Sequence, residues 1–274
     1  MRLWTKIAAV ASLAALAACA GPSRSVVTNS SIGSGQSIQG SFVGGAVPLL
    51  GDSRPHTWTG GHPYNHQIHG VDVSRYQGNV NWNAARAAGI NFAFIKATEG
   101  ADHSDPAFRT YWEGTRAAGI PRSAYHFWYH CRSGAEQAAW YIANVPREPG
   151  MLPPVLDMEW VHTSRTCRVK PSPQQIVAEA NVFLDTIHRY YGQRPVVYTT
   201  VDFYRETNIG RLNAEFWLRS VADHPRNIYP GQRWTFWQYT GTGTAPGFVG
   251  NVDLNAFAGN SLQWRQWVNR RSVR

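Results

Sequence analysis

Short apolar runs alternate with longer amphipathic runs along the chain from Gly70 onward. The short runs have the length of buried strands, whereas the longer ones place apolar residues at the three-to-four-residue spacing of a helix. The clearest helix covers 176–191 and is stopped by Gly192, a residue type that commonly follows a helix end. The pattern predicts strands over 68–73, 91–97, 123–128, 155–160, 196–199, 216–221, 234–239 and 252–257, and further helices over 82–88, 106–118 and 135–145.

An internal echo supports this order of elements. Arg86-Ala87-Ala88-Gly89-Ile90 recurs thirty residues later as Arg116-Ala117-Ala118-Gly119-Ile120. Each copy joins a helix end, a glycine and the start of a strand, which fits one strand–helix unit, and repeated units imply a parallel sheet. Eight strands predict an α/β fold that closes into a TIM-like barrel, with the later strands too close together for full helices between them. The alternative is an open doubly wound sheet, although the chain has no glycine-rich nucleotide fingerprint.

The predicted strand at 155–160 ends in two carboxylates. Asp157 and Glu159 are two residues apart, so they share one face of the strand with Cβ atoms roughly 6–7 Å apart. Two acids this close repel each other, which raises one pKa and can keep one carboxyl protonated as a general acid beside an ionised partner. The alternative is a frayed strand end with two incidental acids.

Three further acids are predicted at strand ends. Asp72, Glu99 and Asp253 join Asp157 and Glu159 there. In barrels of this class the chemistry takes place at the carboxyl ends of the strands. This placement favours an enzyme.

The first eighteen residues are typical of an export signal. A basic start, 1–6, precedes an apolar run, 7–18, that is too short to cross a bilayer. Leu16-Ala17-Ala18-Cys19 resembles the bacterial lipoprotein signal, which is cleaved before a lipid-modified cysteine; the alternative is an ordinary signal peptide with a chance cysteine at 19. Ala20 follows Cys19, which in similar Gram-negative lipoproteins indicates the outer membrane. We expect an exported protein anchored to the cell envelope through Cys19, on the periplasmic side of the outer membrane.

Residues 19–66 are rich in Gly, Ser, Pro, Asn and Gln, which predicts a flexible tether between the signal, 1–18, and a barrel domain, 67–274. Histidines occur here at 56, 62, 66 and 69, but without the spacing of known metal ligands. We therefore expect no metal and no cofactor.

Two cysteines remain beyond the export signal. Cys131 and Cys167 each follow a predicted strand by a few residues, so their loops can meet on one rim if those strands are neighbours. A disulfide is the favoured interpretation for an exported protein. The alternatives are two free thiols, or a redox or nucleophilic cysteine, although neither has a CxxC partner.

Charge and aromatic content restrict the partner. The formal net charge is +9, and removal of Arg2 and Lys6 with the signal leaves 24 basic and 17 acidic residues. A basic surface suits an anionic polymer, but the chain has no nucleic-acid motif, so we expect none bound. Twelve Trp and twelve Tyr can line a sugar groove, although a densely packed core is the alternative.

Seven stretches, in order over about 68–258, resemble glycoside hydrolase family 25, the muramidases that cut peptidoglycan. The resemblance implies a distorted barrel with fewer helices than strands, (β/α)5(β)3. The stretches are Gly70-Val71-Asp72-Val73-Ser74, Phe92-Ala93-Phe94-Ile95-Lys96-Ala97-Thr98-Glu99-Gly100, Tyr125-His126-Phe127, Val155-Leu156-Asp157-Met158-Glu159, Val196-Val197-Tyr198, Trp237-Gln238-Tyr239 and Val252-Asp253-Leu254-Asn255.

By this resemblance, Glu159 is the general acid and Asp157 orients or stabilises the N-acetyl group of the muramic sugar. Asp72 and Asp253 flank the acid and complete the catalytic set. Further residues look like sugar-groove residues: Glu99, Tyr125, His126, Phe127, Tyr198, Trp237 and Gln238. Some have structural alternatives: Glu99 as a partner of Lys96, His126 as a core histidine, and Tyr198 and Trp237 as packing residues. We expect a monomer whose partner is peptidoglycan.

The chain also departs from the family pattern. Arg219 and Ser220 stand where the family usually shows a small residue and an aromatic, and a basic loop, 161–170, follows the catalytic strand. Leu152 and Val155 occupy positions where chitinase-like relatives carry aspartates, which argues against a chitinase. Two other functions are considered: a wall-binding module that has lost turnover, which the four acids disfavour, and a zinc amidase, for which no ligand-spaced set is present.

Overall fold

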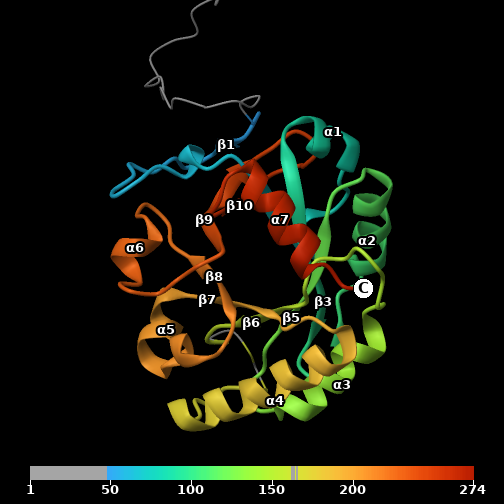
Figure 1. The fold of residues 1–274 in the computed structure, drawn as a ribbon, viewed down its shortest axis with the longest axis vertical. Coiled ribbons are helices and arrows are strands. Elements are labelled where there is room, and N and C mark those ends of the chain that lie inside the picture. The colour runs from blue at the N-terminus through green and yellow to red at the C-terminus, as the bar shows by residue number, and fades with distance from the viewer. Residues whose placement is uncertain (1–47, 162–163, 165) are drawn as a thin grey trace, which may run out of the picture. The chain divides into compact units, whose positions relative to one another are not determined.

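The computed structural model describes residues 48–161, 164 and 166–274. The signal peptide, Cys19 and the first part of the predicted tether lie outside these residues. The eight predicted strands all form and pair in a ring, because β8 pairs with β9 and β10 pairs with β2 (Figure 1). This confirms the predicted distorted TIM-like barrel. Its strands are β2 (His69–Val73), β3 (Ile90–Glu99), β5 (Arg122–Phe127), β6 (Val155–Met158), β7 (Val196–Thr199), β8 (Glu215–Arg219), β9 (Phe236–Thr244) and β10 (Val252–Phe257).

The strands from β2 to β9 run parallel around the ring, but β10 runs antiparallel to both of its neighbours. The expectation of an entirely parallel sheet is therefore wrong at β10. The physical reason is the connection: residues 245–251 form a short hairpin, and a parallel neighbour would need a longer crossover. As a result, residues at the amino end of β10 lie on the same rim as the carboxyl ends of the other strands.

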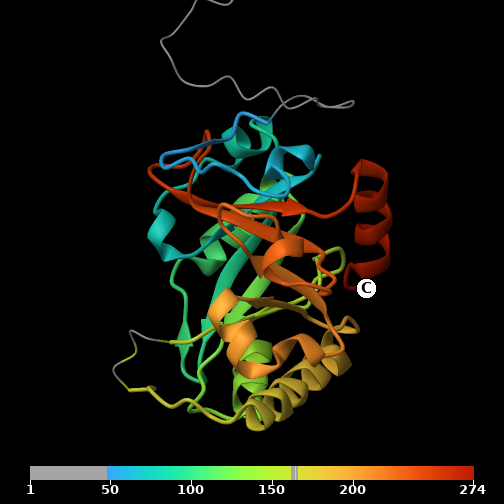
Figure 2. The same ribbon diagram turned by 90° about the vertical axis from the view of Figure 1, so that its left-hand side faces the viewer.

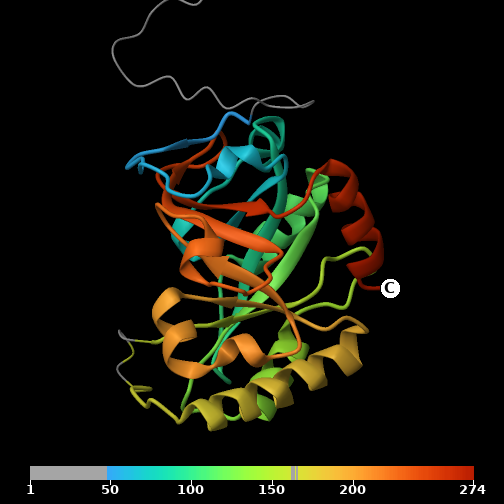
Figure 3. The same cartoon turned by 60° about the vertical axis from the view of Figure 1, so that its left-hand side comes forward.

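The helices follow the pattern (β/α)5(β)3. One helix follows each of the first five barrel strands, and the single turn α6 (Pro225–Ile228) is the only helix between β8 and β10. In Figure 3, α3 and α4 lie side by side along one edge of the barrel. The five helices are α1 (Trp82–Ala87), α2 (Phe108–Ala117), α3 (Gly134–Asn144), α4 (Pro173–Tyr191) and α5 (Val201–Thr207).

The observed bounds of α4 have clear local causes, and its start at Pro173 is three residues earlier than the predicted one. Ser172 caps its first turn by accepting from the Gln175 amide, and Pro173 occupies the first helical position, where no amide hydrogen is needed. Gly192 ends the helix in the left-handed region, with φ of 74°. The predicted stop at Gly192 is thus confirmed.

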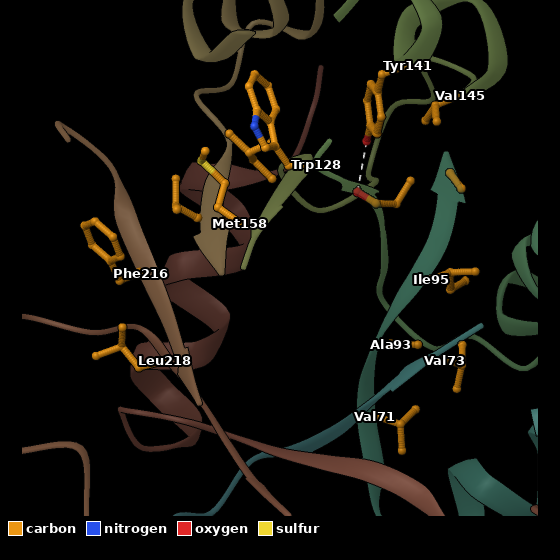
Figure 4. Packing of buried hydrophobic residues seen from close by; sticks show 14 of the residues in the cluster. Val71, Val73, Ala93, Ile95, Trp128, Tyr141, Val145, Met158, Phe216 and Leu218 are labelled. Atoms are coloured by element: carbon orange, nitrogen blue, oxygen red, sulfur yellow. Dashed lines mark hydrogen bonds between the residues drawn. The ribbon is translucent and has the colours of Figure 1, made fainter. Parts of the chain in front are cut away.

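Alternation along each strand divides the apolar core into two parts. Figure 4 shows Ala93 and Ile95 on β3 directed to the same side as Val71 and Val73 on β2, into the core that the surrounding helices cover. Phe92 and Phe94 occupy the opposite face and belong to the second cluster, which fills the barrel. This is the two-residue periodicity expected of a strand that is buried on both faces.

A terminal helix that the hydrophobic pattern did not reveal, α7 (Ser261–Arg271), stands against one side of the barrel (Figure 2). Its Trp264 and Trp267 stack with ring centroids 5.6 Å apart. Both rings also contact Phe257 from β10, at 5.2 and 6.0 Å. Most of its other residues are polar, so the two buried tryptophans, with the partly buried Val268 beside them, attach it to the barrel.

The predicted tether is wrong from residue 48 onward. Strand β1 (Gly51–Asp52) pairs with β9, and Trp58 packs edge-on against Trp237 at 5.5 Å. A single 3₁₀ turn, η1 (Pro63–Asn65), places Tyr64 against Tyr239, with ring centroids 6.2 Å apart. The Gly- and Pro-rich composition gives no sign of these aromatic contacts, which attach residues 48–66 to the barrel. We call residues 48–66 the N-terminal strap.

Smaller elements complete the fold. Strand β4 (His103–Ser104) pairs with the end of β3, and the 3₁₀ turns η2 (Arg75–Gln77) and η3 (Ile209–Arg211) follow β2 and α5. Within the described part of the chain, no helix is both long and apolar enough to cross a membrane.

Candidate active site

Four of the predicted acids meet at one rim of the barrel. Asp72 and Asp157 lie near the carboxyl ends of β2 and β6, and Glu159 follows β6 directly. Asp253 lies near the start of β10, but because β10 is antiparallel it pairs in register with Asp72. Asp253 is therefore on the predicted rim for a different reason from the one expected.

Asp72 is the centre of a buried hydrogen-bond network. Its Oδ2 accepts from the Gln238 amide at 3.0 Å and from the Asn255 amide at 2.7 Å. Tyr198 donates to Gln238 Oε1 at 2.8 Å, and the Trp217 indole donates to Asn255 Oδ1 at 2.7 Å. Burial raises the pKa of Asp72 to about 6, although both amides lower it. The network holds this carboxylate in one orientation.

Burial is also the largest cause of the raised pKa values at Asp157 and Glu159. The pKa of Glu159 rises to about 7; the charges of Asp202 and Asp72 add to burial, while Arg219 and Lys96 act against it. The pKa of Asp157 rises well above its usual range, with Glu159 as the second cause. Mutual repulsion, on which the sequence-based expectation rested, is thus secondary to burial.

Asp157 has one unusual feature. Its Oδ1 is buried and has no hydrogen-bond partner among the residues that the structure describes. A buried oxygen without a partner is costly, and such atoms are often found where a ligand binds.

The fourth acid, Asp253, has a pKa raised to about 8. Burial is the main cause, and the charge of Asp72 comes next. Arg219 opposes both effects. Near neutral pH the rim therefore retains protons that ordinary exposed carboxyls would release.

Tyr125 and Phe127 lie on the face of β5 that belongs to the site. Tyr125 is buried, and after burial the charges of Asp72, Asp157 and Asp253 raise its pKa, so the phenol lies near all three acids. Phe127 is half-buried and carries the Lys96 ammonium 4.4 Å from its ring centre. Both side chains therefore lie on the same face of β5 as the acids of the rim, and their role in a sugar groove stays a prediction.

Glu99 pairs with Lys96 at 2.5 Å and accepts a hydrogen bond from Tyr129. Burial would raise its pKa, but Lys96 and the two hydrogen bonds lower it overall, so Glu99 is ionised. The alternative role, as the partner of Lys96, is the one observed. The charge of Lys96 also lowers the pKa values of Asp157 and Glu159, so the pair acts on the site at short range.

Two predicted groove residues lie outside the barrel interior. His126 is fully buried between Thr98 and Gln137, which bond its two ring nitrogens at 2.8 and 3.0 Å. Trp237 is also fully buried and donates to the Ser220 carbonyl at 2.7 Å. Strand alternation explains both corrections: Tyr125 and Gln238 take the inner face, so their neighbours must point outward.

His130 is a residue that the sequence pattern did not identify. Its Nε2 lies 3.0 Å from the Glu159 carbonyl oxygen, and its ring packs between Trp160 at 5.1 Å and Phe203 at 5.3 Å. Burial lowers its pKa, so the neutral ring donates through Nε2. His130 therefore fixes the backbone that carries Glu159, and no motif in the sequence signals this contact.

A disulfide joins Cys131 and Cys167, whose Cα atoms are 5.5 Å apart and which are 36 residues apart in sequence. It links the loop after β5, which includes His130, to the loop after β6, which follows Glu159. Asn255 and Trp217 were also missed as site residues. Their positions two residues from Asp253 and Arg219 on the same strand faces could have indicated them.

No group of three or more His, Cys, Asp or Glu side chains is arranged to hold a metal within the described ranges. The arrangement at the rim is instead typical of acid catalysis: buried carboxyls with raised pKa values, one of them locked by amides and one with a free oxygen.

A family model described as "Glycosyl hydrolases family 25" matches residues 71–248. The chain belongs to glycosyl hydrolase family 25. Lysozyme M1 of Streptomyces globisporus is 33% identical over 210 residues, covering 72% of this chain and 69% of the relative. The uncharacterized protein YegX of Escherichia coli O6:H1 is 34% identical over 212 residues, covering 76% and 75%. The family 25 structure from Bacillus anthracis superimposes with a TM-score of 0.71 at 31% identity, covering 79% of this chain and 99% of that one.

The family 25 domain is thus a glycoside hydrolase. Asp72, Asp157 and Glu159 lie inside the matched range, whereas Asp253 follows its end by five residues. The register with Asp72 is what places Asp253 in the same site.

Proposed function

We propose that the protein is a muramidase that hydrolyses the β-1,4 bond between N-acetylmuramic acid and N-acetylglucosamine in peptidoglycan. The observation that carries this proposal is the cluster of four buried acids at one rim of a family 25 barrel. Similarity to Lysozyme M1, to the N,O-diacetylmuramidase of Chalaropsis and to the lysozyme structure from Streptomyces coelicolor supports the substrate class.

Glu159 is the general acid. With a pKa of about 7 it holds a proton at neutral and mildly acidic pH and can give it to the leaving glycosidic oxygen. The hydrogen bond from His130 to its carbonyl restricts the backbone, which favours one approach of the carboxyl to the bond.

Asp157 stabilises the substrate N-acetyl group. Its partnerless Oδ1 can accept the acetamide N–H, which supplies the missing hydrogen bond and favours the ionised carboxylate. That carboxylate then offsets the positive charge that grows on the sugar as the bond breaks. Asp72 and Asp253 complete the negative rim, and the amides of Gln238 and Asn255 keep Asp72 in place.

The protein acts on the cell wall from an exported, lipid-anchored position. The anchor is Cys19, and the site is the periplasmic side of the outer membrane; the basic start, apolar run and Leu-Ala-Ala-Cys sequence support this. If Cys19→Ala protein fractionates with membranes as the unaltered protein does, the anchor is ruled out.

The test of the activity is release of reducing ends from purified peptidoglycan, with mass spectrometry to identify the sugar at each new end. We expect N-acetylmuramic acid at that end. Glu159→Gln keeps the size of the side chain but cannot donate a proton, so turnover should fall by ~10²–10⁴-fold while wall binding persists. Wall binding without any release by the unaltered protein would favour the alternative, a catalytically weak peptidoglycan-binding module.

A further inference from the structure

Arg219 is the last residue of β8 and lies at the mouth of the barrel. Its strand partner is Gln238, which donates to Asp72. Trp217, two residues earlier on β8, points inward to Asn255. By strand alternation, Arg219 shares that inward side, one step closer to the rim.

The backbone at this strand end is held firmly from outside. The Arg219 carbonyl accepts from the Tyr229 hydroxyl at 2.6 Å, and the next carbonyl, that of Ser220, accepts from Trp237. The position of Arg219 relative to the acids is therefore fixed by buried aromatic residues.

The side chain itself is exposed, and its guanidinium makes no hydrogen bond or ion pair among the described residues. Its charge nevertheless lowers the pKa values of Asp72, Glu159 and Asp253. By contrast, arginines that form ion pairs among the described residues contact their carboxylates directly, as between Arg122 and Glu148 at 2.6 Å. Arg219 is thus a cation at the site that no carboxylate of the described residues holds in contact.

We propose that Arg219 binds a carboxylate carried by the glycan strand beside the bond that is cut. The proposal rests on the muramidase function and adds a specificity-determining contact to it. A guanidinium presents two parallel N–H groups that match a carboxylate. In peptidoglycan that carboxylate has two sources: the lactyl group of muramic acid where no peptide is attached, and the acids of the stem peptide where one is.

This contact explains why a positive charge lies beside four acids. The acids disfavour an anionic substrate, and Arg219 at the mouth offsets this repulsion where the substituent lies. A contact to a group remote from the broken bond is made equally before and during the reaction, so it lowers KM and leaves kcat little changed.

The test compares Arg219→Gln and Arg219→Lys with the unaltered protein on three soluble glycan substrates. The first carries native stem peptides, the second carries stems whose carboxyls have been converted to amides, and the third has been freed of stems by an amidase, which exposes the lactyl carboxylate. Arg265→Gln is the matched control, because Arg265 is exposed on α7 and loses the same charge away from the rim.

For Arg219→Gln we expect kcat/KM to fall roughly tenfold, through KM, on the substrate that carries the relevant carboxylate, and by less than twofold on the amidated one. Arg219→Lys should recover part of the loss, and Arg265→Gln should match the unaltered protein. A loss on stem-bearing strands alone assigns the stem, and a loss on stem-free strands alone assigns the lactyl group.

An equal loss on charged and amidated strands would overturn the proposal, because Arg219 would then act only on the protonation of the acids. So would no loss on any substrate, or a loss confined to kcat. Absence of cleavage by the unaltered protein would instead overturn the muramidase function and this inference with it, so the two failures are distinguishable.

Discussion

The two parts of the barrel wall are covered in different ways. From β2 to β7 each strand is followed by a helix, and the outer face is buried under α1 to α5. From β8 to β10 the only helix between strands is the single turn α6, and the N-terminal strap lies on Trp237 and Tyr239 instead. The helical part is built from a repeated unit, whereas the other part depends on contacts that are distant in sequence.

The four acids of the rim are divided between these two parts. Asp157 and Glu159 come from β6 in the helical part, and Asp253 comes from β10 in the other. Asp72, on β2, joins them, because its amide partners Gln238 and Asn255 lie on β9 and β10. The helical part therefore carries the proposed proton donor, Glu159, whereas the helix-poor part holds Asp72 in its orientation.

The largest effect is expected when the charge of Asp72, which connects the two parts, is removed and its hydrogen bonds are kept. In Asp72→Asn the amide oxygen can still accept from Gln238 and Asn255, so the network persists. We expect turnover to fall about a hundredfold, because the negative charge facing the developing positive charge is lost.

The pH profile of the same variant gives a second measure. The charge of Asp72 raises the pKa of Glu159, so its removal lowers that pKa below about 7. The alkaline limb of kcat/KM, where the general acid loses its proton, should move to lower pH. A limb that stays in place or moves upward would show that Asp72 is not close enough to act on the acid.

The next largest effect concerns the N-terminal strap. Trp58→Ala removes the ring that packs on Trp237 and Tyr239, and Trp58 is only partly buried, so we expect a loss of about 2 kcal/mol in the free energy of unfolding. Val182→Ala on the exposed face of α4 is the control and should change little. Chemical denaturation measures both; equal, small effects would mean that the strap does not stabilise the barrel.

A smaller effect is expected at His130. His130→Phe keeps a ring between Trp160 and Phe203 but leaves the Glu159 carbonyl without its donor. We expect kcat to fall roughly tenfold with KM nearly unchanged, while His130→Gln, which retains an N–H group, loses less. If the two variants are equally impaired, the hydrogen bond does not position Glu159.

A separate prediction concerns the pH dependence of stability. The pKa values of Asp72, Glu159 and Asp253 rise to about 6, 7 and 8, so the folded protein holds protons that the unfolded chain releases near pH 4. The free energy of unfolding should therefore fall as the pH rises from about 4 to about 8. Asp253→Asn should flatten the fall of Tm over this window, and an unchanged slope would contradict the raised pKa of Asp253.

The sequence predicted the helical part well, because each strand–helix unit has a hydrophobic pattern that can be recognised within a short stretch of sequence. The stop at Gly192 and the strand before Glu159 can be read directly, although β6 ends at Met158, two residues earlier than expected. The helix-poor part has fewer local sequence patterns of this kind. The direction of β10 is set by a hairpin, and the position of the N-terminal strap by aromatic contacts to residues more than 170 positions away.

The site residues divide in the same way. The two-residue spacing of Asp157 and Glu159 on a predicted strand is visible in the sequence, and it predicts that the two carboxylates lie together. The family motif predicts that His126 and Trp237 both face the groove, but only alternate residues of a strand reach the interior, so these two side chains point outward. The contact of His130 with a backbone carbonyl has no side-chain signature, since any residue provides such an oxygen.

The pairing of β10 with β2 also determines when activity can appear during synthesis of the chain. Asp72 is translated early, but Gln238 and Asn255, which fix it, follow 166 and 183 residues later. A ribosome-bound or truncated chain that lacks β9 and β10 cannot orient this carboxylate or bring Asp253 beside it. We therefore expect nascent and prematurely terminated chains to be unable to cut the wall polymer. Hydrolytic competence would then arise only once the ring has closed.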